Sequence, residues 1–136
     1  MLTLKNMFLF APIKTGYGDG SGTVNERHLA FYRERSQHVG AVTVEPFYLD
    51  KGLREIPTQL GIDGNDKVAG VAELTDAIHV AGAKVIAHLN HPGRMANPNI
   101  PGNYFVSATD KPCENGGATP KRMDQNDMEQ IVHLFA

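Results

Sequence analysis

Three short apolar runs alternate with helical segments along this chain, and that alternation constrains the fold more than any other feature. Met7–Ala11 is a continuous apolar run ended by Pro12, which is the pattern of a strand buried on both faces. Ala41–Glu45 and Lys84–Asn90 are the second and third predicted strands. The sequence therefore predicts three short strands separated by enough chain for a crossover.

Helices are predicted between and after these strands, over residues 25–37, 68–82 and 124–136. Asn25 and Asp124 offer N-caps, and apolar residues recur at helical spacing in the later two segments. Such an order of strands and helices implies parallel strands joined by right-handed crossovers. It predicts an α/β fold, and periodicity alone leaves open both a doubly wound sheet and a barrel.

Composition excludes several classes of function. The formal net charge is −2 and the Lys and Arg residues are not clustered, so we expect neither a nucleic-acid nor an anionic-membrane partner. The longest apolar run, Met7–Ile13, is too short to span a bilayer, and we see no signal peptide. The single cysteine, Cys113, cannot form an internal disulfide, so we expect a reducing, cytoplasmic location.

In parallel α/β folds, active sites form at the carboxyl ends of the strands. Residues 11–17, 45–50 and 88–94 occupy those positions here and are rich in polar residues, Gly and Pro. The segment 11–17 could bring backbone groups and the side chain of Lys14 or Thr15 against a planar ligand, or it could be a simple strand exit.

Two predictions concern charged and metal-binding side chains near these positions. Glu45 ends a buried strand, so it is either a site residue or paired with a basic group, whereas Arg54 and Glu55 in the following loop are expected to be solvated. His88 and His91 lack the additional carboxylate or thiolate ligands that zinc requires, so we predict no metal site.

In this order, the three strand-end segments and their neighbours resemble the Old Yellow Enzyme family of NADH:flavin oxidoreductases, especially the branch of 2,4-dienoyl-CoA reductases. The matching pieces are Leu4–Asn6, Ala11–Ile13, Thr15–Gly16, Asp19–Thr23, Tyr32–Arg35, Thr43–Glu45, Leu89–Arg94, Ser107–Ala108 and Asp124–Ala136.

The resemblance implies a TIM (β/α)₈ barrel that holds FMN above the carboxyl ends of its strands. Such enzymes pass a hydride from NADH or NADPH, through the flavin, to the activated C=C bond of a small-molecule substrate. By position, Ala11, Pro12 and Ile13 would lie along the isoalloxazine ring. Lys14 or Thr15 would approach its reactive edge.

The other two strand ends depart from the family pattern. Pro46 stands beside Glu45, close to the flavin, where relatives commonly have Gly or Ala. His88 stands where the family usually has a Gln that hydrogen-bonds the pyrimidine part of the ring. The eight residues at the three strand ends form the predicted FMN rim, on the premise that Pro12, Pro46 and His88 gather around one flat ring.

The chain is expected to be incomplete as an enzyme. A TIM barrel takes roughly 250 residues, and residues 1–136 supply only about the first three strand–helix units of an FMN-binding barrel domain. The resemblance places the catalytic pair, the FMN phosphate site and any iron–sulfur cluster beyond Ala136, so the chain alone is expected to be inactive.

Two other readings remain open. The chain could be a non-catalytic remnant or interaction module that has lost the chemistry, or a small flavodoxin-like binding protein. An open three-stranded sheet exposes an edge, so self-association is also expected.

Overall fold

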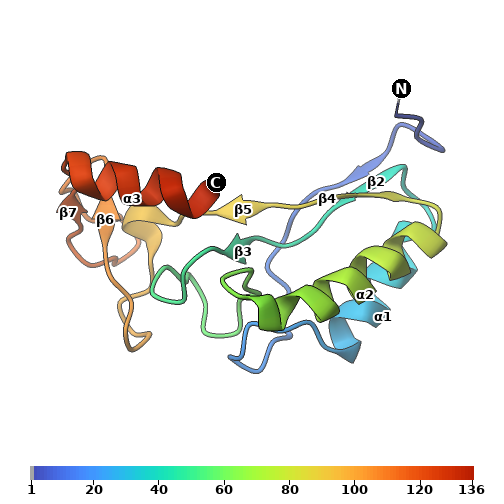
Figure 1. The fold of residues 1–136 in the computed structure, drawn as a ribbon, viewed down its shortest axis with the longest axis horizontal. Helices are drawn as coiled ribbons and strands as arrows, with labels where there is room; N and C mark the ends of the chain where they lie inside the picture. Colours follow the sequence, from blue (N-terminus) through green and yellow to red (C-terminus); the bar gives the residue numbers. More distant parts are fainter. Residues whose placement is uncertain (1) are drawn as a thin grey trace.

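A computed structural model describes residues 2–136 and shows a small parallel sheet with helices on one face (Figure 1). β1 (Leu9–Phe10), β2 (Ala41–Thr43) and β4 (Lys84–Ile86) form the sheet in that order. Leu9 pairs with Ala41, and Ala41 pairs with Lys84, both in parallel register. The predicted parallel direction of the strands is therefore confirmed.

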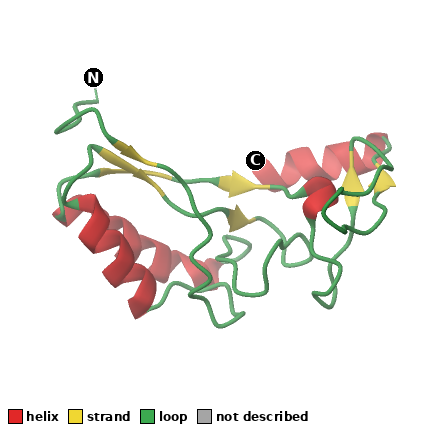
Figure 2. Ribbon diagram, turned by 180° about the vertical axis from the view of Figure 1, so that it is seen from behind, coloured by secondary structure: helices red, strands yellow, loops and turns green. Residues whose placement is uncertain are grey.

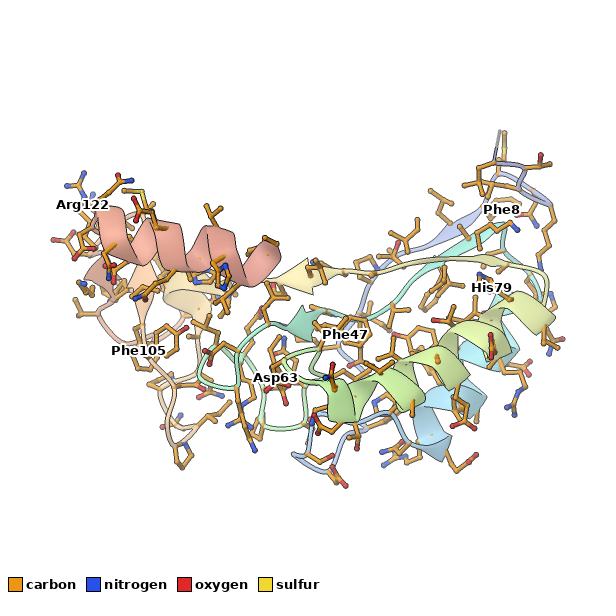
Figure 3. The ribbon with its side chains drawn as sticks, viewed as in Figure 1. Phe8, Phe47, Asp63, His79, Phe105 and Arg122 are labelled. Carbon is orange, nitrogen blue, oxygen red and sulfur yellow. The ribbon has the colours of Figure 1, made fainter. Side chains whose placement is uncertain are left out.

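The two helices that join these strands pack together on the same face of the sheet (Figure 1). They are α1 (Glu26–Ser36) and α2 (Val68–Val80), the latter preceded by a short 3-10 turn over Asn65–Lys67. The buried core between the helices and the sheet consists of Leu29, Tyr32, Val42, Val44, Phe47, Leu60, Leu74, Ile78 and Ala83. Phe47 lies between its strand and α2 in Figure 3, where it closes the end of this core.

Both predicted N-caps are present. The Asn25 side chain accepts hydrogen bonds from the backbone N–H groups of Arg27 and His28. The backbone N–H of Asn25 in turn donates to His28 Nδ1 at 3.2 Å. Asp124 makes the equivalent reciprocal pair with Asp127 at the start of α3 (Gln125–Phe135), with both bonds at 3.0 Å. Each cap satisfies backbone donors that the first helical turn leaves free.

The prediction that residues 7–11 form a strand buried on both faces is wrong for this chain. Met7 is 86% exposed, and Phe8 and Leu9 are also exposed. The reason is that β1 has β2 on one side only, and the sheet carries helices on one face only (Figure 2). An apolar run indicates that the side chains of a strand are suited to burial, but it does not show whether another element covers that strand.

The predicted loops contain further short elements. β3 (Phe47–Tyr48) pairs in parallel with β5 (Leu89–Asn90), so the third predicted strand is divided into β4 and β5. The stretch 92–120 holds a 3-10 turn, Gly93–Met95, and β6 (Val106–Ser107), which pairs with β7 (Lys121–Arg122). Two-residue strands are too short to show an alternating pattern, so periodicity could not find them.

Within residues 2–136, none of the helices combines the length and the apolar character needed to cross a bilayer.

Candidate functional site

The exits of the strands converge on one rim at the carboxyl end of the sheet. Beyond β2 and β4 the ladder continues, because the N–H of Val44 donates to the carbonyl of Ile86 at 3.0 Å. The N–H of Phe47 then donates to the carbonyl of His88 at 2.8 Å. These bonds place the chain at Pro46 beside the chain at His88.

Glu45 ties the exit of β1 to the exit of β2. Its side chain is fully buried, and its two carboxylate oxygens accept from the hydroxyl of Thr15 at 2.8 Å and from the Thr15 N–H at 3.4 Å. Burial raises the pKa of Glu45, and the hydrogen bonds from Thr15 oppose that rise. The structure therefore places Thr15, at the exit of β1, against Glu45, at the exit of β2.

His28 faces the same carboxyl group from α1. Its Nδ1 accepts the Asn25 N–H, so the proton of the neutral ring is on Nε2, which lies 3.7 Å from Glu45 Oε1. Burial lowers the pKa of His28, so both members of this fully buried pair favour their neutral forms. The sequence analysis did not select His28, whose place at the third position of α1 lets it take part in the cap at Asn25.

Lys14 reaches a different carboxylate. It pairs with Glu55, whose other oxygen accepts from Asn90 Nδ2 at 2.9 Å. The expectation that Arg54 and Glu55 are solvated is wrong: Arg54 is 8% exposed and the Glu55 side chain 13%. The carbonyl of Arg54 accepts from the Asn97 N–H and from Asn103 Nδ2, so the loop after β3 packs against the segment 97–103.

The remaining predicted residues divide by exposure. Ala11, Pro12, Ile13 and Lys14 are exposed along the exit of β1, whereas Pro46 is buried. The first four present backbone and apolar atoms at the surface, as contact with a flat ring would need.

A flavin ring also has polar edges, and the rim offers groups to meet them. His88 Nδ1 and His91 Nε2 are buried side-chain nitrogens that have no hydrogen-bond partner. Buried polar atoms normally have partners, so these two nitrogens are suited to a ligand's donors and acceptors. The exposed exit of β1 and these two unpartnered nitrogens are thus chemically suited to a flat ring with polar edges.

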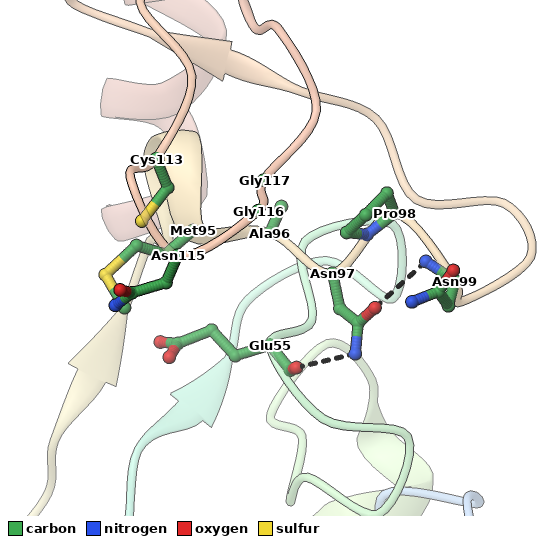
Figure 4. Close-up of a pocket in the computed structure, with 10 residues that line it drawn as sticks. All are labelled: Glu55, Met95, Ala96, Asn97, Pro98, Asn99, Cys113, Asn115, Gly116 and Gly117. Atoms are coloured by element: carbon green, nitrogen blue, oxygen red, sulfur yellow. Dashed lines mark hydrogen bonds between the residues drawn. The ribbon is translucent and has the colours of Figure 1, made fainter.

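A cavity of about 260 Å³ lies next to the rim, on the side of the C-terminal segment (Figure 4). It is lined by Glu55, Met95, Ala96, Asn97, Pro98, Asn99, Cys113, Asn115, Gly116 and Gly117. None of the eight predicted rim residues lines it; Glu55 alone connects it to Lys14. Within residues 2–136, no three His, Cys, Asp or Glu side chains lie close enough to hold a metal ion.

Comparison with known proteins relates this geometry to a family. The model of the NADH:flavin oxidoreductase / NADH oxidase family matches residues 1–136. The chain is 34% identical over 135 residues to the NADH:fumarate oxidoreductase of Klebsiella pneumoniae, covering 97% of this chain and 14% of that protein. It is 30% identical over 137 residues to the NADH oxidase of Thermoanaerobacter brockii, covering 98% of this chain and 21% of that protein.

The structure is similar to that of the old yellow enzyme from Trypanosoma cruzi, with a TM-score of 0.85 and 19% identity. The similarity covers 98% of this chain and 43% of that one. The fold is therefore part of a TIM barrel, and of the two α/β folds that periodicity left open, the barrel is the correct one. The chain spans only a small part of the curated relatives that it matches, and it belongs to the NADH:flavin oxidoreductase / NADH oxidase family.

Proposed function

We propose that this chain supplies the first three strand ends of an FMN-binding rim in an NADH- or NADPH-dependent oxidoreductase that reduces activated C=C bonds. The observation that carries the proposal is the convergence of Thr15, Glu45, Pro46 and His88 at one edge of a parallel sheet. Membership of the family and the names of its relatives, which include NADH:fumarate oxidoreductase and NADH oxidase, support it.

In this proposal each strand exit has its own task. The exposed segment Ala11–Ile13 lies along the ring, and Lys14 or Thr15 meets its reactive edge. Pro46 narrows the space beside Glu45, and His88 gives a hydrogen bond to the pyrimidine part. Bound FMN would supply the hydride-accepting and hydride-donating chemistry, while these residues orient the ring.

The complete activity belongs to a larger assembly of strands. We propose that residues 1–136 form the N-terminal portion of the barrel domain and do not turn over alone. The pair that binds substrate, the phosphate site and any iron–sulfur cluster would come from further strands or domains. A cytoplasmic location is part of the same proposal.

The alternative is a non-catalytic interaction module, and the exposed edge of β1 favours it. Met7, Phe8 and Leu9 are exposed next to an unpaired strand edge, a surface on which sheets associate. In either case we expect the isolated chain to self-associate. A monomer that sediments as one species and melts sharply would contradict this expectation.

Purification distinguishes the two functions. We expect a chimera in which residues 1–136 replace the matching segment of the T. brockii NADH oxidase to retain FMN and absorb in the flavin band. The matched control is the same chimera with Thr15→Val and His88→Ala, which should retain less FMN. A colourless chimera that is folded by circular dichroism would refute FMN binding and favour the interaction module.

A further inference from the structure

The carboxylate of Glu55 joins two strand exits that are distant in sequence. One oxygen pairs with Lys14, which follows β1, and the other accepts from Asn90 in β5 at 2.9 Å. The Glu55 side chain is 13% exposed and that of Lys14 is 32% exposed. The ion pair is thus partly shielded from water. Shielding lowers the local dielectric constant, so the attraction between the two charges is stronger than at an open surface.

The backbone of Glu55 is itself held in place by two side-chain amides, those of Gln59 and Asn97. Its N–H donates to Gln59 Oε1 at 2.8 Å, and Gln59 Nε2 donates to the carbonyl of Pro46 at 3.2 Å. Asn97 Nδ2 donates to the carbonyl of Glu55 at 3.2 Å (Figure 4). Because Gln59 is fully buried, its hydrogen bond fixes the backbone of Glu55, and this restricts the position of the Glu55 carboxylate.

We propose that Glu55 is a positioning residue that holds the Lys14 ammonium at the rim, at the edge of the flavin ring, and offsets part of its charge. This inference rests on the proposed function of the rim. The inference extends that function to Glu55, a residue outside the predicted FMN rim. Lys14 has a flexible four-carbon side chain, so without a partner held in place its ammonium group would sample many positions in solvent.

The first test needs no flavin. Acetic anhydride labelling of the full chain, read residue by residue by mass spectrometry, reports how free each lysine is. In Glu55→Gln we expect Lys14 to label roughly three- to fivefold faster, as when a half-buried ion pair is lost. Lys5 is the internal reference for folding, because its ammonium donates to three backbone carbonyls. Glu73→Gln, the same charge change on the exposed face of α2, is the control variant and should leave Lys14 unchanged.

Each outcome of the labelling is decisive. Faster labelling at Lys14 with Lys5 unchanged supports the proposal, and an unchanged rate at Lys14 overturns it. If both lysines label faster, Glu55→Gln has unfolded the chain, and Glu55→Asp then decides. That variant keeps the negative charge, but its side chain is one methylene shorter, so the carboxylate lies further from the Lys14 ammonium. Lys14 should therefore still label faster while Lys5 does not. An unchanged rate at Lys14 overturns the proposal.

The second test separates positioning from a purely structural role. In flavin-loaded protein we expect Lys14→Met to lower the midpoint potential by about 30 mV, a tenfold change in the ratio of reduced to oxidised flavin. In the Glu55→Gln background the same substitution should have at most a third of that effect, because the ammonium has already left the ring edge. Equal effects in both backgrounds would overturn the role of Glu55. Failure of the protein to bind FMN would instead remove the proposed function and leave the labelling result to stand.

Discussion

Replacing Tyr32 by Phe tests how α1 supports the rim. Tyr32 is fully buried, and its hydroxyl accepts the backbone N–H of Glu45 at 2.7 Å. Phe keeps the ring and its edge contacts with Phe10 and Phe31 while removing that acceptor. The substitution therefore leaves one buried backbone donor without a partner, next to the residue that holds Thr15.

The structure sets the size of the effect. A buried donor that loses its only partner costs about 1–3 kcal/mol of the free energy of unfolding. For a chain of this length each kcal/mol corresponds to roughly 3–4 °C, so we expect Tm to fall by about 3–12 °C. Tyr48→Phe is the matched control, because Tyr48 is equally buried but its hydroxyl lies 3.5 Å from its acceptor, the carbonyl of Ser21. A contact of that length is weak, and its loss should cost less than about 0.5 kcal/mol.

Urea unfolding followed by circular dichroism, at one low protein concentration for all variants, measures both substitutions. The expected result is a lower midpoint for Tyr32→Phe, with a smaller change for Tyr48→Phe. Equal losses for the two variants, or no loss for Tyr32→Phe, would refute the claim that the Tyr32 hydroxyl supports Glu45.

Two further substitutions test the buried part of the site and the core. Burial raises the pKa of Glu45 above its usual 4.5, so its contribution to stability is full below that pH and is lost as pH rises through the folded-state pKa. Relative to Glu45→Gln, the wild-type midpoint in urea should therefore fall as pH rises above 4.5, and a difference that stays constant with pH would contradict this. Leu74→Ala should cost about 2–5 kcal/mol by calorimetry, since the side chain is buried between α2 and the sheet, whereas the exposed Val80→Ala should cost less than about 0.5 kcal/mol.

The sequence predicted those parts of the fold that depend on local pattern. The caps at Asn25 and Asp124 are local hydrogen-bond arrangements, and both are present. The three apolar runs correctly located the strands, because short apolar segments of this length are typically found as strands within a sheet. Their parallel order followed from the crossover helices between them.

Features that depend on distant contacts could not be predicted. Glu55 was expected to be solvated, and its partners lie 41 residues away at Lys14 and 35 residues away at Asn90. No local spacing records such pairs. The exposure of Met7 was missed for the same reason, because coverage of a strand depends on which elements surround it. The assignment of Lys14, Thr15 and His88 to a flavin site came from the resemblance, and it remains a prediction.

Backbone hydrogen exchange of the FMN-retaining chimera, with and without FMN, tests the central claim most directly. We expect FMN to slow exchange at residues 13–15 and at 87–91, the exits of β1 and β4, while the outer face of α1 is unchanged. Protection confined to residues 93–117, around the neighbouring cavity, would contradict the claim that the exits of β1 and β4 border one flavin ring.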